Sequence, residues 1–450
     1  MQATWEALLG PQVDSFEGDD RQPARTGIVV IGGGIIGIST ALALARAGVA
    51  VTLCEKGQLV GEQSSRNWGW VRKTGRDERE IPLIIASLLL WKDMNRTVAA
   101  ETGFRDCGVL YVSETDADRA HHEAWLERAQ PYQMSSRMVE GEELAALVPG
   151  AARAYKAGLY TADDGRAEPQ KAGPAIAKAA QRAGAVILTQ CAVRGLDMAA
   201  GRVAGVVTEH GRIACDGVVL AGGAWSRLFC GSLGLRLPQL KVRSSVLRTA
   251  PIAGGPDVSA WTSQFAYRKR MDGGYTIANG QANVVPLVPD TLRFLREFIP
   301  AIRATRRSLR PRLDGRFMAE ARTPRNWALD AKSPFEDVRM LDPVPTPGIN
   351  GAAVKAIKAA FPVFRDMQIV QEWAGMIDVT PDAIPVISAV DAVPGLVVAT
   401  GFSGHGFGIG PAAGRLAADL VTGAAPIVNP TPFRFSRFSD GSPIVVEAPA

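Results

Sequence analysis

The clearest hydrophobic pattern in the chain is a run of four apolar residues at 28–31, which is followed by a glycine-rich turn. A short run with no polar position is typical of a parallel strand that is covered on both faces. A helix is predicted after the turn, ending at Gly48, and a second strand is predicted at 49–54. The pattern therefore predicts a strand–helix–strand unit near the N-terminus.

The glycines of this turn have the spacing of a dinucleotide-binding loop, Gly32-x-Gly34-x-x-Gly37. In such a loop the first glycine allows a tight turn, the second lets a pyrophosphate approach the backbone, and the third lets the helix pack on the strand. Glu55 follows the second strand close to the spacing, about 20 residues, of the carboxylate that binds an adenosine ribose. A lone GxGxxG is weak evidence, but here the whole unit is present. We therefore predict a dinucleotide site with its pyrophosphate at a helix N-terminus.

The rest of the chain alternates predicted helices with short predicted strands. Residues 1–26 are predicted to form a short helix and a polar lead-in. Later helices are predicted at 82–94, 168–183 and 411–420, the last with Pro411 at its first position. The predicted strands are 185–189, 201–208, 212–214, 218–220, 267–270, 275–278 and 396–399.

A second glycine-rich turn, at 401–410, precedes the last predicted helix. A dehydrogenase that binds only a nicotinamide has no need of a second turn of this kind. A flavin does need one, because its pyrophosphate occupies the first helix N-terminus and the negative charge of the reduced ring is stabilised by the second. The loop at 63–80, with Trp68, Trp70 and Arg72, is expected near the same edge of the sheet.

Composition and charge exclude several classes of protein. With 450 residues, of which 47% are hydrophobic and 21% charged, the chain is long enough for two or more domains and is ordinary for a globular enzyme. The net charge of +5 is local, because residues 293–325 contain ten arginines and three carboxylates and the remainder is slightly acidic. One arginine-rich helical stretch is more typical of a solvated face or a subunit contact than of a nucleic-acid site. We predict no nucleic-acid partner, and an oligomer remains open.

The five cysteines include no C-x-x-C pair, which argues against a disulfide framework or a zinc site and fits a reducing compartment. The first 20 residues lack the basic start and the long apolar segment of a secretory signal. No run of about 18 apolar residues occurs that could span a membrane. We therefore expect a cytoplasmic protein without metal or transmembrane segment, either free or peripheral to the inner membrane.

Four blocks of the sequence together resemble those of one known family, and these blocks are 32–55, 219–225, 373–385 and 401–414. Their order and spacing are similar to those of the FAD-dependent D-amino-acid oxidase superfamily, which includes glycine oxidase, sarcosine oxidase and D-amino-acid dehydrogenases. The resemblance implies an α/β fold, with a Rossmann-type FAD-binding domain and an interleaved α+β substrate domain built on an antiparallel sheet. The implied FAD-binding domain is 27–80, 151–235 and 366–424, the substrate domain is 81–150 and 236–365, and 1–26 and 425–450 are terminal extensions.

The resemblance also implies which residues contact FAD. Glu55 would bind the ribose, Ser64 and Ser65 would lie near the pyrophosphate, and Val193 would lie near the adenine. The complete set of implied contacts is Gly32, Gly34, Ile35, Ile36, Gly37, Glu55, Lys56, Ser64, Ser65, Arg66, Asn67, Trp68, Gly69, Val193, Ala221, Gly222, Trp225, Gly404, His405, Gly406, Phe407 and Gly408.

Two departures from the family pattern bear on cofactor and substrate. Gly375 stands where family members with a covalent flavin have a cysteine, and no histidine occurs between Glu55 and Lys92, so noncovalent FAD is expected. Met376 and Ile377 stand where glycine-oxidase-like members have an arginine for the substrate carboxylate. The remaining candidates for this role are Arg268, which we favour, Arg66 and Arg72.

The chemistry that the family implies is oxidation of the C–N bond of an amino acid or N-substituted amino acid. A hydride passes to flavin N5, the resulting imine is hydrolysed to an oxo compound and an amine, and oxygen or a downstream acceptor reoxidises the flavin. Orientation and a dry site matter more than a strong base. The candidate catalytic residues are His405, Arg268, Trp68 and Tyr267. Asp382 is interpreted as a cap of its turn.

Three alternatives remain open at this point. The substrate could be an amine without a carboxylate, in which case Met376, Ile377 and the tryptophans would form an apolar pocket. A flavin monooxygenase would share the first fingerprint, and an accessory electron-transfer flavoprotein would be consistent with the basic stretch.

Overall fold

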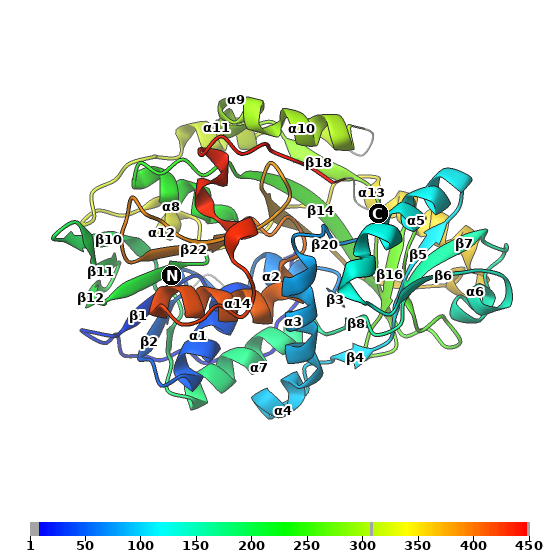
Figure 1. Ribbon diagram of the computed structural model, residues 1–450, viewed down its shortest axis with the longest axis horizontal. Coiled ribbons are helices and arrows are strands. Elements are labelled where there is room, and N and C mark those ends of the chain that lie inside the picture. Colours follow the sequence, from blue (N-terminus) through cyan, green and yellow to red (C-terminus); the bar gives the residue numbers. More distant parts are fainter. Residues whose placement is uncertain (1–8, 307–308, 448–450) are drawn as a thin grey trace.

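The computed structural model describes residues 9–306 and 309–447 (Figure 1). Its first sheet has six strands in the order β21-β22-β13-β1-β2-β9, parallel except for β21. These strands are β1 (Ile28–Ile31), β2 (Val51–Cys54), β9 (Val186–Leu188), β13 (Gly217–Leu220), β21 (Val386–Ala389) and β22 (Leu396–Thr400). The part of the predicted N-terminal helix within residues 1–8 lies outside the described residues, and 9–26 contain no helix.

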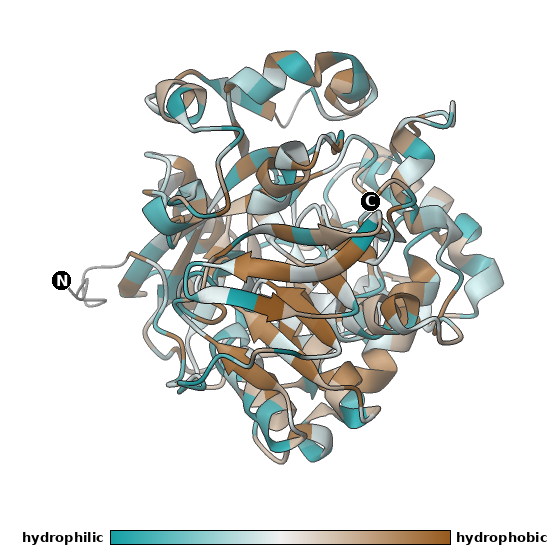
Figure 2. Cartoon of the chain, turned by 90° about the vertical axis from the view of Figure 1, so that its left-hand side faces the viewer, coloured by the Kyte–Doolittle hydropathy of each residue, from teal (hydrophilic) through white to brown (hydrophobic). Residues whose placement is uncertain are grey.

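Both faces of this sheet are covered, as the unbroken apolar run predicts. Successive side chains of a strand point to opposite faces, so Val30 packs in one core while Val29 and Ile31 pack in the other. The first core lies against the helices α1 (Ile35–Arg46), α3 (Ile81–Lys92), α7 (Pro169–Arg182) and α14 (Gly406–Thr422). The second lies against α8 (Ser226–Ser232) and the sheet of β10 (Val193–Ala199), β11 (Arg202–Thr208) and β12 (Gly211–Ala214). Figure 2 shows the hydrophobic strands in the centre of the molecule.

The second large sheet has ten strands and is mostly antiparallel. Its order is β19-β18-β14-β17-β16-β15-β5-β7-β6, and β20 pairs with β14. The strands are β5 (Val109–Ser113), β6 (Ser136–Val139), β7 (Ala157–Thr161), β14 (Leu240–Thr249), β15 (Ser259–Trp261), β16 (Ala266–Lys269), β17 (Tyr275–Ala278), β18 (Asn283–Pro286), β19 (Leu309–Arg312) and β20 (Ile369–Val379). Helix α13 (Ile349–Ala360) packs on one face and α5 (Asp116–Ala129) on the other.

Short elements connect these layers. They are α2 (Gln63–Arg66), β3 (Trp70–Val71), α4 (Met94–Val98), β4 (Arg105–Asp106), α6 (Gly141–Leu147), β8 (Gly165–Arg166) and α12 (Pro334–Asp337). The expected α/β fold with a second, largely antiparallel sheet is confirmed. The expected domain boundaries remain a proposal. Several elements lie away from their expected part: α3 packs on α14, while β7 and β20 join the ten-stranded sheet.

The arginine-rich stretch is not one helix. It forms α9 (Pro289–Arg293), α10 (Leu295–Thr305), β19 and α11 (Arg316–Arg322), and residues 307 and 308 lie outside the described part. The predicted helical stretch is interrupted by β19, which pairs in parallel with β18 at the edge of the large sheet. The three helices lie together along the top of the view in Figure 1.

The predicted helix start at Pro411 was also wrong, since α14 begins at Gly406 and contains Pro411 in its interior. A proline inside a helix removes one N–H donor and disturbs the neighbouring bonds. Helix α3 compensates here, because Ser87 Oγ and Trp91 Nε1 donate to the carbonyl of Gly408 at 2.7 and 2.9 Å. The tight contact between α3 and α14 therefore permits the early helix start.

Candidate active site

One cleft runs along the carboxyl ends of β1, β2 and β13 and continues to β20 and the first turn of α14. It contains both glycine-rich turns that the sequence singled out. Ligands of open α/β sheets bind at this edge, where the strand order reverses.

The glycines of the first turn have different physical roles. Gly32 has φ +108°, and a Cβ there would lie 2.4 Å from the Ala221 carbonyl oxygen. A Cβ at Gly37 would lie 1.9 Å from the Gly32 carbonyl oxygen, so the fold itself requires both glycines. Gly34 has an extended backbone, with φ −75° and ψ 177°, and a Cβ there would meet only Ser64 Oγ, at 3.0 Å. Packing alone therefore does not require a glycine at position 34, in contrast to positions 32 and 37.

Backbone donors and one carboxylate converge at the start of α1. The N–H of Ile35 donates to Ser64 Oγ at 2.9 Å, and the N–H of Gly33 donates to Glu55 at 2.7 Å. Glu55 also accepts from the N–H of Gly57, and burial raises the pKa of its carboxyl, against the opposing effect of Lys56. Helix N-terminal N–H groups suit a pyrophosphate, and a buried carboxylate suits ribose hydroxyls. This donor set fits the adenosine diphosphate part of FAD.

The far end of the cleft offers a buried acceptor without a partner. Gln63 Oε1 has no hydrogen-bond partner among the described residues. It lies close to Gly375, because a Cβ built on Gly375 would be only 2.1 Å from this oxygen. A buried polar atom that is left unpaired costs free energy unless a ligand satisfies it. Gln63 is therefore suited to accept a hydrogen bond from a bound cofactor.

Most of the predicted cofactor residues line this one cleft. They are Gly32, Gly34, Ile35, Ile36, Glu55, Lys56, Ser64, Asn67, Val193, Ala221, Gly222, Trp225, Gly404, Gly406 and Phe407. The predicted residues that do not line it are Gly37, Ser65, Arg66, Trp68, Gly69, His405 and Gly408. A role in binding FAD stays a prediction for each of them.

Several lining residues were missed from the sequence. They include Gln58, Glu62, Gln63, Phe335 and Asp378. Met376 also lines the cleft, and the sequence placed it only in the apolar pocket of the alternative substrate. The sequence pattern of β20 could have indicated two of these residues. Met376 and Asp378 are two positions apart in a strand that ends beside the second glycine-rich turn, so their side chains point to the same face.

Asp378 fixes that second turn. Its carboxylate accepts from the N–H of Gly401 at 2.7 Å, from Gln239 Nε2 at 3.1 Å and from Thr400 Oγ1 at 3.2 Å. Burial raises the pKa of Asp378 to about 6, despite these hydrogen bonds. Asp378 therefore links β20 to the loop that lines the cleft at Phe402, Gly404 and Gly406.

His405 faces away from the cleft toward α3. Its Nδ1 lies 2.9 Å from Glu80 Oε2, and Glu80 is also 3.5 Å from Arg76 Nη1. Burial, reinforced by the charges of Arg76 and Arg72, lowers the pKa of His405 to about 4. His405 is therefore neutral at neutral pH and donates Nδ1–H to the Glu80 carboxylate. A direct catalytic role for His405 has no support from this position.

The three candidate arginines have different surroundings. Arg268 is 1% exposed, and its guanidinium donates to both carboxylate oxygens of Glu168, at 2.8 and 3.0 Å. Arg66 is 2% exposed and pairs with Asp342 at 2.6 Å. Arg72 forms no ion pair with any carboxylate of the described residues; it donates to the Thr74 carbonyl and lies 5.4 Å from the centre of the Tyr111 ring. Only Arg72 of the three remains available for a substrate, so the preference for Arg268 has no support from its position.

The aromatic candidates also differ in their surroundings. Tyr267 is 1% exposed and packs with Phe265, Phe361 and Phe364 in the core beneath the large sheet. The rings of Trp68 and Trp70 instead make an edge-to-face contact, with their centres 5.3 Å apart. Trp70 lies beside the first turn of α14, since a Cβ built on Gly408 would lie 3.1 Å from the Trp70 carbonyl oxygen. Asp382 caps its turn as predicted, accepting from the N–H of Ile384 at 3.2 Å.

Comparison with known families identifies this architecture, since residues 27–420 match the FAD dependent oxidoreductase (DAO) family. The protein belongs to that family. It is a flavoenzyme that uses FAD and acts as an oxidoreductase on C–N bonds. None of the helices among the described residues is long and apolar enough to cross a membrane.

Two relatives of this DAO-family protein cover nearly its whole length. The structure of L-amino acid deaminase from Proteus myxofaciens in complex with anthranilate has a TM-score of 0.91 at 34% identity, covering 96% of this chain and 97% of that chain. L-amino acid deaminase from Proteus vulgaris has a TM-score of 0.90 at 31% identity, covering 94% and 100%. In sequence, glycine oxidase of Pseudomonas aeruginosa is 28% identical over 417 residues, which are 90% of this chain and 97% of the relative.

FAD is expected to be bound without a covalent link. A cysteine at position 375 would place its Cβ 2.1 Å from Gln63 Oε1, so the cleft is built around a glycine there. Acid precipitation of the purified yellow protein should release all of its colour into the supernatant, measured by flavin absorbance. Colour that stays in the pellet would contradict a noncovalent site.

His405 should make stability depend on pH. Its pKa is about 4 in the folded protein and 6.5 ordinarily, so the unfolded chain binds a proton first as pH falls. The contribution is present above pH 6.5 and is lost as pH falls toward 4, amounting to about 3 kcal/mol. The measurement is the free energy of urea unfolding at several pH values, for the wild type and His405→Gln. The difference between them should shrink as pH falls from 6.5 toward 4.

Proposed function

We propose that this protein oxidises the C–N bond of an α-amino acid, with transfer of the α-hydrogen as hydride to the bound flavin. The observation that carries the proposal is the cleft that joins the two glycine-rich turns, together with an arginine, Arg72, that has no carboxylate partner among the described residues. The charge of Arg72 acts on His405, which stands between the cleft-lining Gly404 and Gly406. The long match to the two L-amino acid deaminases supports L-α-amino acids with a free amine as the first substrates to test.

Arg72 and Trp70 are the proposed carboxylate anchor. Trp70 lies in β3, and Arg72 directly follows that strand. Both side chains lie against Tyr111, and the ring centres of Trp70 and Tyr111 are 6.4 Å apart. Trp70 Nε1 is buried with no hydrogen-bond partner among the described residues. An unpaired indole N–H and an available guanidinium together suit a carboxylate in a partly dry site.

When bound, FAD supplies a two-electron acceptor for the hydride. The chain contributes orientation: Arg72 and Trp70 hold the carboxylate, and Phe402 and Phe407 exclude water from the cleft. The substrate amine reacts in its neutral form, because its lone pair forms the C=N bond as the hydride leaves. The resulting iminium loses a proton to give the imine, and the imine reacts with water to give an oxo acid and ammonia. Asp378 is engaged by Gly401, Gln239 and Thr400. A carboxylate base is not required, because the amine already reacts in its neutral form.

Anaerobic mixing with a panel of compounds tests the proposal. The panel contains L- and D-amino acids, N-methyl amino acids and the matching decarboxylated amines, and the readout is loss of the oxidised flavin absorbance. Fast bleaching by amino acids is expected. Bleaching by NADPH without any amine would indicate a monooxygenase instead. No bleaching by any amine, together with a stoichiometric partner on purification, would indicate an accessory flavoprotein.

A further inference from the structure

The C-terminal segment 425–447 lies beyond the family match, which ends at residue 420. Although the segment is a surface strap without long helices or strands, it contains one buried charged side chain, Arg437, which is 6% exposed. An arginine is rarely buried unless it is paired. The partner of Arg437 therefore indicates what the strap holds.

Arg437 holds the turn that carries Asp382. Its Nε and Nη2 donate to the two carboxylate oxygens of Asp382 at 2.8 and 3.1 Å, and Asp382 is 4% exposed. Nη2 also donates to the Ile384 carbonyl at 2.7 Å, and Nη1 to the Arg434 carbonyl at 3.0 Å. A paired arginine with these further bonds fixes orientation as well as charge.

The Asp382 turn in turn packs on the cleft loop. Thr380 Oγ1 donates to the Ile384 carbonyl at 2.7 Å and lies 3.4 Å from Ser403 Oγ, while the N–H of Thr380 lies 3.3 Å from the same hydroxyl. Gly401 also contacts Thr380, since a Cβ on Gly401 would lie 2.4 Å from Thr380 Cγ2. Ser403 has φ +51°, in the left-handed region, so neighbouring contacts must hold it there.

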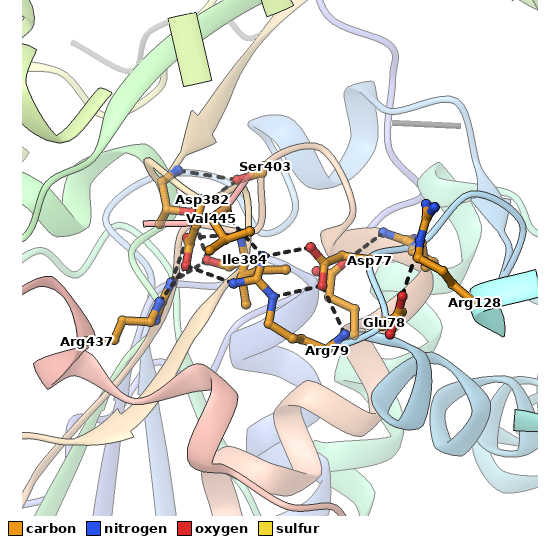
Figure 3. A network of polar contacts seen from close by, with 12 residues as sticks. Asp77, Glu78, Arg79, Arg128, Asp382, Ile384, Ser403, Arg437 and Val445 are labelled. Atoms are coloured by element: carbon orange, nitrogen blue, oxygen red, sulfur yellow. Dashed lines mark hydrogen bonds and ion pairs between the residues drawn. The ribbon is translucent and has the colours of Figure 1, made fainter. Parts of the chain in front are cut away.

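A second set of contacts connects the segment before α3 to the same turn and loop. Arg79 lies 3.7 Å from Asp382, pairs with Asp77 at 2.7 Å and donates to the Val445 carbonyl at 3.0 Å. Figure 3 shows Arg79 and Arg437 converging on Asp382. The next residue, Glu80, binds His405 at the other end of the loop.

We propose that Arg437 is a positioning residue for the cofactor. Through Asp382 it fixes the turn at 380–384, and this turn fixes residues 401–406, of which Phe402, Gly404 and Gly406 line the cleft. Loss of the guanidinium leaves the Asp382 carboxylate buried with less compensation, so the turn moves toward water and the loop loses its support. The consequence falls on FAD affinity and on the flavin environment.

The test compares Arg437→Met with Arg434→Met, whose arginine makes an exposed pair with Asp440 in the same strap. FAD is titrated into apoprotein, and the absorption and visible circular dichroism of bound FAD are recorded. Arg437→Met is expected to raise the FAD dissociation constant at least tenfold and to change the visible dichroism, Arg434→Met to change neither, and Arg437→Lys to recover part of the affinity.

A purely structural strap gives a different result. Arg437→Met would then unfold at lower denaturant concentration while binding FAD with wild-type affinity and dichroism, and the proposal would be overturned. If Arg437→Met does not fold, Asp382→Asn combined with Arg437→Gln removes both charges and keeps polar side chains. Wild-type affinity and dichroism in the folded double variant would equally overturn the proposal, and weakened binding would support it.

Discussion

Replacing Gly34 with valine should abolish FAD binding while leaving most of the fold intact. The added Cβ would meet only Ser64 Oγ at 3.0 Å, and φ −75° with ψ 177° is a backbone conformation that valine adopts readily. The rest of the side chain would extend into the cleft at the start of α1, where the pyrophosphate must approach the N–H groups. We expect affinity for FAD to fall by at least about 100-fold, because several charge-assisted hydrogen bonds are lost together.

The matched control is Gly351→Val in α13. Gly351 is exposed, and no atom lies within 4 Å of a Cβ built there. Both variants are purified and compared by flavin-to-protein absorbance ratio, by far-ultraviolet circular dichroism and by FAD titration. Full flavin content in Gly34→Val would show that the cofactor does not bind at this turn.

The part of the site that is formed by residues close together in the chain was predictable from the sequence. The apolar run 28–31 became β1 with the predicted bounds, and the glycines and Glu55 meet at its end. These features depend on residues within one strand–helix–strand unit, where backbone sterics and hydrophobic period act over short distances. The second glycine-rich turn was found for the same reason.

The non-local half was not predictable. Arg268 pairs with Glu168, one hundred positions away in the chain, and Arg66 pairs with Asp342. Charge pairing between distant segments leaves no periodic signal, so an arginine that is already neutralised looks the same in sequence as one that is free. The same holds for Gln63, whose place beside Gly375 depends on the packing of α2 against β20.

Replacing Arg72 with methionine should raise KM for the best amino-acid substrate by more than tenfold, with FAD content unchanged. Methionine keeps much of the side-chain volume beside Tyr111 but removes the guanidinium. Loss of one charge-assisted contact to a carboxylate in a partly dry site costs on the order of 2 to 5 kcal/mol. Steady-state kinetics separate this effect on KM from an effect on kcat.

Two further arginine variants serve as controls. Arg248→Met changes a half-buried arginine toward the far end of β14, paired in register with Gln371, and should leave KM unchanged. Arg268→Met should instead destabilise the protein, because it leaves the Glu168 carboxylate buried without its partner. A selective rise in KM for Arg268→Met, with normal stability, would return the anchor to the position that the sequence favoured.

A decarboxylated amine distinguishes the anchor from the apolar alternative, in which Met376, Ile377 and the tryptophans hold a substrate without a carboxylate. If Arg72 binds the carboxylate, the wild type prefers the amino acid to its decarboxylated analogue, and Arg72→Met reduces that preference by slowing flavin reduction only for the amino acid. The rate with the decarboxylated amine is then the same in both proteins, because this amine has no carboxylate that Arg72 could bind. If the amine reduces the wild-type flavin as fast as the amino acid does, and Arg72→Met alters neither rate, the absence of an arginine at Ile377 reflects a change of substrate, because a carboxylate with no charged partner gains nothing from entering a dry site.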